Sequence, residues 1–596
     1  MCGIVGEIRF DGRRVNSSQR DYMMKTIISR GPDSSGLYEE NSFFLGHRRL
    51  SVIDTSAKSN QPMIDEELRL VIIFNGVIYN FKELRTKLRK EGYSFSSNGD
   101  TEVILKSYHF YGEKCVQYFD GVFSFCIYDM KNKTFFLSRD RLGIKPLYYK
   151  LSGKAFSFSS TMKSMLDCTG REINIKALNY HFFLHSVVPA PHTLFSNIYK
   201  LEPGHSISVN NQGKISKQKY HSFSDIEMIT NNKKEDIIDN IDQLLLNSIK
   251  KRLLTADVPV GILLSGGLDS SLITAIAHKY NLCDVETFSI GFRSISSEEG
   301  DEFYYSDLVS NQYSSNHKKI VISDEELIRN LDNVIECMPE PMSSQDASAF
   351  FLLAREVSKK QKVVLSGQGA DELFGGYPWY QKMSESTLET DTDKFMKFYL
   401  DRDIKDYEKT IHEDFSSSED SYDFLSSSMK NYKDKNLSFL DKLLRFDISC
   451  LIVDDPIKRV DSMTMSWGLE TRVPFLDLDL VEYFLSVPSK NKIKNNGKYY
   501  LKELSKKYLE SNIINRPKFH FPVPPLKILE GGVLDFVKNV LLSEACLDRG
   551  IFKSDNIKEM LKQPNSDYTK LEGNKLWHLA VFERWFQLNI DKKNPS

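Results

Sequence analysis

The chain has 596 residues, of which 41% are hydrophobic and 27% charged, and its formal net charge is -2. A chain of this length exceeds what one hydrophobic core supports, so we expect at least two domains. The balanced charge lacks the basic surface expected of a protein that binds nucleic acid or acidic membranes. No apolar run is long enough to span a membrane. We therefore expect a cytoplasmic protein that binds small molecules and associates with copies of itself, as in a homodimer.

Residues 1–205 are expected to form a β-rich domain. The run from Met1 to Phe10 has the composition of a strand and lacks the basic and long apolar regions of a secretory signal. Helical patterns follow at Asn80–Glu91 and Thr101–Gly112, the second with Asp100 as its predicted N-terminal cap. Further strands are predicted from β-branched and aromatic runs at Leu70–Asn75, Gly121–Asp129 and Thr134–Arg139.

A polar stretch, residues 206–235, is expected to carry a hairpin and then a linker. Beyond it, residues 236–596 alternate short apolar strands with helical patterns, which indicates βαβ units around a parallel sheet. The serine-rich and charged stretch 384–437 predicts surface helices or loops. The expected strands are Val258–Leu264, Glu286–Gly291 and Lys362–Ser366, and the clearest helices are Ser270–Tyr280 and Ala347–Lys360.

Cys2 stands at a chemically special position. Seven of the eight cysteines are expected to be reduced, mostly buried thiols, because no CxxC pair is present. Removal of Met1 before a small residue would leave the α-amino group of Cys2 beside its own thiol. A free amine near neutral pKa can act as general base for that nucleophile, as in N-terminal-nucleophile enzymes. A cysteine at position two alone is more often a small buried hydrophobe, so the neighbouring motifs decide.

Five motifs follow in order: Cys2-Gly-Ile-Val-Gly6, Arg30-Gly-Pro-Asp33, Gly46-His-Arg-Arg-Leu-Ser51, Phe74-Asn-Gly76 and Gly99-Asp-Thr-Glu-Val103. Their order and spacing resemble the glutaminase domain of class II amidotransferases, and asparagine synthetases most. The resemblance implies an α+β N-terminal-nucleophile sandwich in which Cys2 attacks glutamine. It also implies that Asn75 and the N–H of Gly76 stabilise the oxyanion. Arg49 would bind the α-carboxylate of glutamine, and Asp100 its α-ammonium group.

Each polar residue of this set also has an ordinary structural interpretation: Arg49 as a surface salt bridge, Asn75 as a turn former and Asp100 as a helix cap. Their joint order favours the glutaminase interpretation. Two positions depart from the family, because Val77 stands where asparagine synthetases usually have Glu and Ser29 where His is common. Val77 removes one polar contact to glutamine, but Asp100 and Arg49 remain. We therefore expect glutaminase activity to survive.

A glycine-rich loop, Ser265-Gly-Gly-Leu-Asp-Ser270, joins an expected strand to an expected helix. Backbone N–H groups in such a turn form a cradle for phosphates. With a second motif at Ser366-Gly-Gln-Gly-Ala-Asp-Glu372, the loop resembles the ATP pyrophosphatase domain of asparagine synthetases, an α/β parallel-sheet fold of the adenine nucleotide α-hydrolase type. The resemblance implies cleavage of ATP to AMP and pyrophosphate, with Asp269 and Asp371 as Mg²⁺ ligands. The residues that the resemblance assigns to ATP binding are Leu264, Ser265, Gly266, Gly267, Asp269, Ser270, Ile290, Ser366, Gly367 and Lys498. Lys502 is the alternative to Lys498 as the lysine that binds the leaving pyrophosphate.

Gln368 stands where asparagine synthetases usually carry an acidic residue, and an amide cannot act as a base. Motifs that include Met338-Pro-Glu-Pro-Met342, Pro378-Trp-Tyr380 and Phe521-Pro-Val-Pro524 resemble the branch that amidates the C-terminal carboxylate of the dipeptide N-acetylglutaminylglutamine. That acceptor is favoured, and aspartate, which would give asparagine, is the alternative. The residues expected near the acceptor are Glu340, Gln368 and Glu372.

Two other interpretations are disfavoured by residues that the chain retains. A β-lactam-synthetase-like cyclase needs no ammonia and would not need the glutamine-binding residues. A storage or regulatory homologue without turnover would not need the carboxylates and lysine of the ATP site. We therefore expect a glutamine-dependent ligase that forms AMP and pyrophosphate and uses ATP and Mg²⁺.

Overall fold

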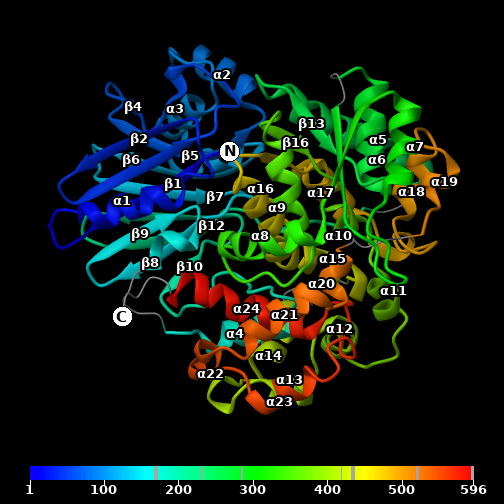
Figure 1. The fold of residues 1–596 in the computed structure, drawn as a ribbon. Coiled ribbons are helices and arrows are strands. Elements are labelled where there is room, and N and C mark those ends of the chain that lie inside the picture. Colours follow the sequence, from blue (N-terminus) through cyan, green and yellow to red (C-terminus); the bar gives the residue numbers. More distant parts are fainter. Residues whose placement is uncertain are drawn as a thin grey trace.

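The computed structural model describes residues 1–166, 172–229, 233–282, 286–417, 419–430, 437–517 and 523–591. It contains an N-terminal sandwich, a parallel-sheet domain beside it and a helical lobe that lies below both in the view of Figure 1. Within those ranges every helix is too short or too polar to span a lipid bilayer. Residues Phe521 and Pro522 of the last sequence motif lie outside the described residues.

The N-terminal domain is a sandwich of two six-stranded antiparallel sheets. Alternating residues of the facing strands, such as Ile4 and Val71, bury their side chains between the sheets. Helix α1 (Ser17–Thr26) covers the outer face of the first sheet, and α2 (Phe81–Lys90) and α3 (Thr101–Tyr111) cover that of the second. This layering confirms the predicted N-terminal-nucleophile fold. The first sheet contains, in spatial order, β10 (Ile198–Lys200), β8 (Tyr148–Ser152), β9 (Ala155–Ser159), β1 (Gly3–Arg9), β3 (Phe43–Arg49) and β2 (Ser34–Glu40), and the second contains β12 (Ile215–Lys219), β11 (His205–Asn210), β7 (Thr134–Arg139), β6 (Gly121–Asp129), β5 (Leu70–Ile78) and β4 (Met63–Asp65).

The hairpin that was expected at the start of the linker belongs to this sandwich. Strands β11 and β12 pair with each other, and β11 also pairs with β7. The second sheet therefore continues to Lys219, beyond residue 205 where the domain was predicted to end. The sequence of β12 is polar because it is an edge strand with exposed side chains. Helix α5 (Lys234–Leu254) then opens the second domain.

The second domain is built on a parallel sheet with the strand order β15-β14-β13-β16-β17. Its central strands are fully buried, as expected for a sheet covered on both faces. Helices α5, α6 and α7 pack together along one face, and α8, α9 and α16 pack together along the other. The strands are β13 (Val260–Leu263), β14 (Glu286–Gly291), β15 (Asn316–Val321), β16 (Val363–Leu365) and β17 (Glu470–Arg472). The helices just named, besides α5, are α6 (Leu268–Lys279), α7 (Phe303–Tyr313), α8 (Asp324–Cys337), α9 (Asp346–Val357) and α16 (Lys458–Met465).

The strand order reverses between β13 and β16. From β13 the chain proceeds to β14 and β15 on one side, and the later strands β16 and β17 lie on the other. In open parallel sheets, ligands bind beyond the carboxyl ends of the strands at such a reversal. The loops that follow β13 and β16 carry the two motifs predicted to bind ATP, so the fold places both motifs at one edge of the sheet.

In its described part, the charged stretch 384–437 contributes to the lobe the α-helices α12 (Asp391–Tyr399), α13 (Ile404–Thr410) and α14 (Glu419–Lys430). Phe395 and Tyr407 are fully buried, so the stretch also contributes to the hydrophobic core. The lobe gathers helices that lie far apart in the sequence, including α4 (Ile175–Phe183) beside α14, and α24 (Lys575–Asn589) (Figure 1).

Candidate active sites

Cys2 lies in a small buried cavity of the sandwich, immediately before β1. It is 8% exposed, and burial raises the pKa of its thiol, so the thiol needs a base to react. Its backbone N–H donates to Asn75 Oδ1 at 3.0 Å. The same cavity is lined by Arg49, Gly76 and Asp100. The structure thus brings the predicted nucleophile and the predicted glutamine-binding residues together.

The predicted oxyanion residues are positioned by β5. Asn75 is fully buried, and its Nδ2 donates to Ser124 Oγ at 3.4 Å across the β5–β6 pair. Gly76 has no room for a side chain, because a Cβ would lie 2.1 Å from the carbonyl oxygen of Val122. This contact explains why a glycine follows Asn75 and why backbone, rather than a side chain, lines the cavity at position 76.

Arg49 is held by the loop that follows β3. One terminal nitrogen donates to Ser56 O and to Asn60 Oδ1, both at 2.8 Å, and the other donates to Asp54 O. A guanidinium fixed in this way keeps one orientation at the cavity wall. Val77 lines the same cavity and gives it an apolar wall where the family usually has a polar one.

Asp100 stands at the N-cap position of α3, as predicted, but its side chain does not cap the helix. Its side chain makes no capping hydrogen bond and instead accepts from the N–H of Ile78 at 3.0 Å. Asp100 is 5% exposed, and this burial raises its pKa to about 6. Its carboxylate therefore faces the Cys2 cavity rather than the start of the helix.

The raised pKa of Asp100 predicts a pH dependence of glutamine binding. Only the ionised carboxylate can pair with an α-ammonium group, so the KM for glutamine should increase as the pH falls below about 6, by up to tenfold per pH unit. Initial rates of glutaminase activity between about pH 5 and about pH 8 measure this effect. Asp100→Asn should show a high KM with no such slope. An unchanged slope in Asp100→Asn would assign the titration to another group.

Glu470 completes the Cys2 cavity although it lies on β17 of the second domain. Its carboxylate pairs with the amino group of Met1 and with Arg472 Nε at 2.7 Å. Burial alone would raise the pKa of Glu470, but in the chain that retains Met1 these two cations hold it at about 2. This role could not be predicted, because Glu470 stands outside the five motifs assigned to the glutaminase domain. The glutaminase cavity is thus closed by a charge from the other domain.

The glycine-rich loop lies at the carboxyl end of β13 and leads into α6. Ser265 N–H donates to Ser270 Oγ, Gly267 N–H donates to Ser265 Oγ, and Ser270 Oγ donates to Gly267 O, each at 3.2 Å. Gly266 has a φ of 77°, and a Cβ there would lie 2.5 Å from the backbone nitrogen of Ser306. The loop is therefore closed and tight, with the N-terminus of a helix behind it, as a phosphate cradle requires.

The pocket beside this loop brings together the residues predicted to bind ATP. Gly367 allows the second motif to approach the first, because a Cβ at Gly367 would lie 3.0 Å from Asp269 Cβ. Gly266 supports the loop by its packing and is not among the described residues that line the pocket. The predicted residues that do line it are Leu264, Ser265, Gly267, Asp269, Ser270, Ile290, Ser366, Gly367, Gln368, Asp371 and Glu372.

Lys498 lies between the two carboxylates predicted to hold Mg²⁺. Its Nζ is 2.6 Å from Asp269 Oδ2 and 2.9 Å from Asp371 Oδ1. Gly376 leaves room for this contact, since a Cβ there would lie 2.4 Å from Lys498 Cε. Lys502 lines the adjoining groove, but its Nζ donates to a backbone carbonyl at 2.6 Å. The cluster of two carboxylates and one ammonium suits a metal-bound polyphosphate, and it favours Lys498 over Lys502.

Two of the three predicted acceptor residues lie in this pocket. Gln368 and Glu372 both line it, and Glu372 accepts from Tyr377 Oη at 2.8 Å. Burial, and then the neighbouring charge of Asp371, raises the pKa of Glu372 to about 7. A carboxyl group with this pKa can exchange a proton near neutral pH.

Glu340, the third predicted acceptor residue, does not lie in the pocket of Gln368 and Glu372, so its predicted place is corrected. It is fully buried and is not among the described residues that line the pocket of Gln368. Its carboxylate is 2.8 Å from Lys200 Nζ and 3.7 Å from Lys458 Nζ. Two lysines from other elements thus compensate the buried charge, and Glu340 serves the domain interface.

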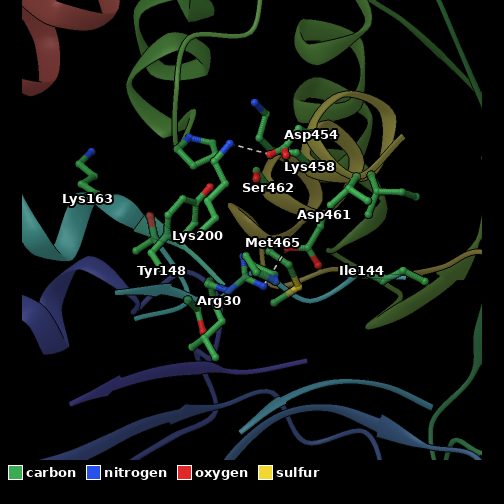
Figure 2. Close-up of a pocket in the computed structure, with 18 of the residues that line it drawn as sticks. Arg30, Ile144, Tyr148, Lys163, Lys200, Asp454, Lys458, Asp461, Ser462 and Met465 are labelled. Carbon is green, nitrogen blue, oxygen red and sulfur yellow. Dashed lines mark hydrogen bonds and ion pairs between the residues drawn. The ribbon is translucent and has the colours of Figure 1, made fainter. Parts of the chain in front are cut away.

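A further cavity lies between the two domains (Figure 2). Its walls come from the sandwich, including Arg30, and from α16, including Ser462 and Met465. Arg30 Nε donates to the carbonyl oxygen of Cys2 at 3.2 Å, and its guanidinium pairs with Asp461 at 2.9 Å. The cavity is therefore lined by Arg30, which contacts the backbone of Cys2, and by α16 of the second domain.

Two family models match most of the chain. The glutamine amidotransferase domain matches residues 1–221, and asparagine synthase matches residues 240–587. The chain belongs to the asparagine synthase family. It is a glutamine-hydrolysing ligase of a family that uses ATP and a carboxylate acceptor. The match to residue 221 agrees with the position of β12 in the second sheet of the sandwich.

Curated members of the asparagine synthase family are similar to this chain, and two of them match it over its whole length. Asparagine synthetase [glutamine-hydrolyzing] 1 of Bacillus subtilis is 30% identical over 100% of this chain and 98% of its own length. Asparagine synthetase 3 of the same organism is 29% identical over 100% of both chains. A putative asparagine synthetase 2 of Methanocaldococcus jannaschii is 36% identical over 63% of this chain and 76% of its own. The first two confirm the predicted combination of glutaminase and synthase domains.

Proposed function

We propose that this member of the asparagine synthase family amidates the C-terminal carboxylate of N-acetylglutaminylglutamine. Gln368 carries the proposal, because asparagine synthetases usually have an acidic side chain at this position. The Gln368 amide both donates and accepts hydrogen bonds, which suits the amide groups of a dipeptide better than the charged ends of aspartate. Gln368 lines both the ATP pocket and the groove that adjoins it, which also contains Tyr377 and Gln381. This groove provides space beside Gln368 for an acceptor longer than aspartate.

Glutamine would be hydrolysed in the sandwich. Cys2 Sγ attacks the amide carbon, and the Asn75 amide and the Gly76 N–H stabilise the oxyanion. The free α-amino group of a processed Cys2 takes the thiol proton and returns it to the departing ammonia. Water then releases glutamate from the thioester. Arg49 and Asp100 would hold the α-carboxylate and the α-ammonium group throughout.

The acceptor would be activated at the edge of the parallel sheet. An acceptor carboxylate oxygen attacks the α-phosphorus of ATP, so that an acyl-adenylate forms and pyrophosphate leaves. Lys498 and the amides of the glycine-rich loop bind the leaving pyrophosphate. Mg²⁺, when held by Asp269 and Asp371, adds neutralisation of the phosphate charge. Ammonia then attacks the acyl carbon and expels AMP, and Glu372 takes the released proton.

Aspartate is the second candidate acceptor, because the relatives of this chain are named asparagine synthetases. We expect pyrophosphate release and amide formation, measured with glutamine and ATP over a panel of carboxylates, to give a kcat/KM for the dipeptide at least about 10²-fold above that for aspartate. Activity with aspartate and none with the dipeptide would contradict the proposal. The panel should be repeated with added ammonia, so that a defect in glutamine hydrolysis is not mistaken for acceptor specificity.

A pair of variants tests the role of Gln368 directly. Gln368→Glu should lower dipeptide turnover by about tenfold or more, because a carboxylate cannot donate to an amide carbonyl. Gln218→Glu makes the same chemical change at an exposed position of β12, outside both sites, and serves as the matched control. Equal effects of both substitutions would remove Gln368 from the acceptor site.

A further inference from the structure

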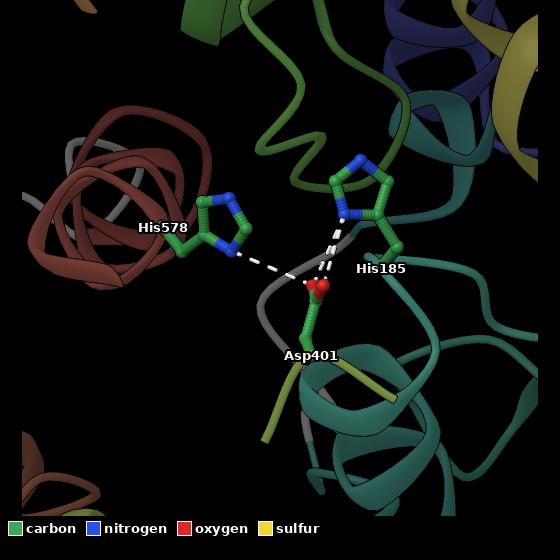
Figure 3. A group of neighbouring side chains, drawn as sticks. All are labelled: His185, Asp401 and His578. Atoms are coloured by element: carbon green, nitrogen blue, oxygen red, sulfur yellow. Dashed lines mark hydrogen bonds and ion pairs between the residues drawn. The ribbon is translucent and has the colours of Figure 1, made fainter. Parts of the chain in front are cut away.

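A cluster of two imidazoles and one carboxylate lies in the helical lobe, with Asp401 and His578 buried and the side chain of His185 12% exposed (Figure 3). His185 follows α4, Asp401 follows α12, and His578 lies in the first turn of α24. His185 Nδ1 is 3.1 and 3.3 Å from the two oxygens of Asp401, and His578 Nδ1 is 3.6 Å from Asp401 Oδ2. Both rings therefore present Nδ1 to one carboxylate.

This set has the chemistry of a transition-metal site. Imidazole nitrogen and carboxylate oxygen are the usual ligands of Zn²⁺ outside thiolate sites. The three potential ligand atoms lie within 4.8 Å of one another. Ligands at about 2.0–2.2 Å from a tetrahedral ion are roughly 3.3–3.6 Å apart, and Asp401 Oδ2 lies 3.1 Å from His185 Nδ1 and 3.6 Å from His578 Nδ1, near this value. The side chains of Asp401 and His578 are only 2% and 7% exposed.

The backbone orients all three residues toward the common point. His185 and Ser186 have φ values of 54° and 62°, a left-handed conformation that is rare for two successive residues with side chains. The N–H of Asp401 donates to Phe183 O at 3.0 Å, which ties the segment after α12 to the end of α4. Gly573 leaves room for the ring of His578, because a Cβ at position 573 would lie 2.4 Å from His578 Nε2.

Without a metal ion, an ion pair explains why His185 lies beside Asp401 but not why His578 does. A protonated His185 bound to Asp401 satisfies that pair. The separation between His578 Nδ1 and Asp401 is too long for a hydrogen bond, and the ring of His578 makes no hydrogen bond to any other described residue. A metal ion would engage both Nδ1 atoms and the carboxylate together, and would leave one position for water or a fourth ligand.

We propose that His185, Asp401 and His578 form a binding site for a Zn²⁺-like transition-metal ion that stabilises the lobe and the segment around Ser343. The residues adjacent to two of the ligands already hold that segment. Ser186 Oγ is 2.6 Å from Ser343 Oγ and accepts from its N–H at 3.2 Å, and Trp577 Nε1 donates to Ser343 O at 3.1 Å.

The Ser343 segment leads directly into α9. Phe350 and Leu353 of α9 line the pocket of the glycine-rich loop. An ion that fixes α4, α12 and α24 to one another therefore also fixes the approach to α9. The site would be structural, since its three residues take no part in the two half-reactions.

Metal binding by the full-length protein tests this proposal. After treatment with a chelator and dialysis, the protein should take up one equivalent of Zn²⁺ or Co²⁺ in the presence of excess Mg²⁺, as measured by mass spectrometry of bound metal and by the Co²⁺ absorption spectrum. A Cys2→Ala background excludes binding by the catalytic thiol. The melting temperature should rise with the concentration of Zn²⁺. Absence of a stoichiometric ion in this protein would overturn the proposal without any histidine variant.

Ligand variants locate the ion. His185→Gln and His578→Gln should each lower the affinity for Co²⁺ by at least about tenfold and abolish the Zn²⁺-dependent rise in melting temperature. His412→Gln removes a half-exposed histidine of the same lobe and should keep one equivalent. Circular dichroism shows whether each variant is folded. Retention of the full equivalent by both folded ligand variants would place the ion elsewhere and contradict the proposal.

Discussion

Cys2→Ala is expected to lower glutamine-dependent amide formation by at least about 10³-fold while synthesis from added ammonia continues. Cys2 provides the thiol in the glutaminase cavity, and no other cysteine is among the described residues that line it. The residues that bind ATP lie in the parallel-sheet domain, so acceptor activation does not need the thiol. Product formation with glutamine and with an ammonium salt, measured side by side, gives both rates.

Cys546→Ala is the matched control for this substitution. Cys546 is 5% exposed in the helical lobe, so the variant removes a buried thiol without touching either site. Both of its rates should stay within about twofold of the unmodified protein. If ammonia fails to support synthesis in Cys2→Ala, the two half-reactions do not occur at separate sites and the two-site model is wrong.

The fold could be predicted where hydrophobic pattern and motif agree. The strand β13 is a short apolar run that leads into a glycine-rich turn, and this combination indicates a parallel sheet. The edge strand β17 has only three residues, too few to show a period of two, and could not be found in this way. The polar strand β12 was assigned to a linker for a similar reason, because an exposed edge strand has the composition of a loop.

The site could be predicted where its residues lie in motifs, and not where partners come from distant parts of the chain. Asp100 was predicted from its motif to bind glutamine, with a helix cap as the ordinary alternative, but neither interpretation foresaw that its carboxylate accepts from the N–H of Ile78 on the adjacent strand. Glu340 was placed with Gln368 by its motif, whereas Lys200 of β10 pairs with it at the domain interface. Glu470 closes the Cys2 cavity from a strand that the sequence did not reveal. In each case the partner is set by tertiary packing.

Asp269→Asn is expected to lower acceptor-dependent pyrophosphate release by about 10²-fold or more, while the glutaminase rate is unchanged. The carboxylate of Asp269 lies 2.6 Å from Lys498 Nζ at the start of α6, in the cluster that also contains Asp371. An amide keeps the size of the side chain but removes the charge that orients the lysine and would bind Mg²⁺. Pyrophosphate and glutamate, measured in the same reaction, report the two sites separately.

Asp307→Asn makes the same chemical change on α7, where Asp307 forms an exposed ion pair with Lys319, and should leave both rates within about twofold. Loss of glutaminase activity in Asp269→Asn would instead show that the two cavities are strongly coupled. The structure offers a route for such coupling, since Glu470 of the parallel sheet lines the Cys2 cavity and β17 pairs with β16, whose carboxyl end leads into the Asp371 motif. A selective loss of pyrophosphate release would mean that this connection transmits little of the charge change at Asp269, and that the glycine-rich loop acts on ATP alone.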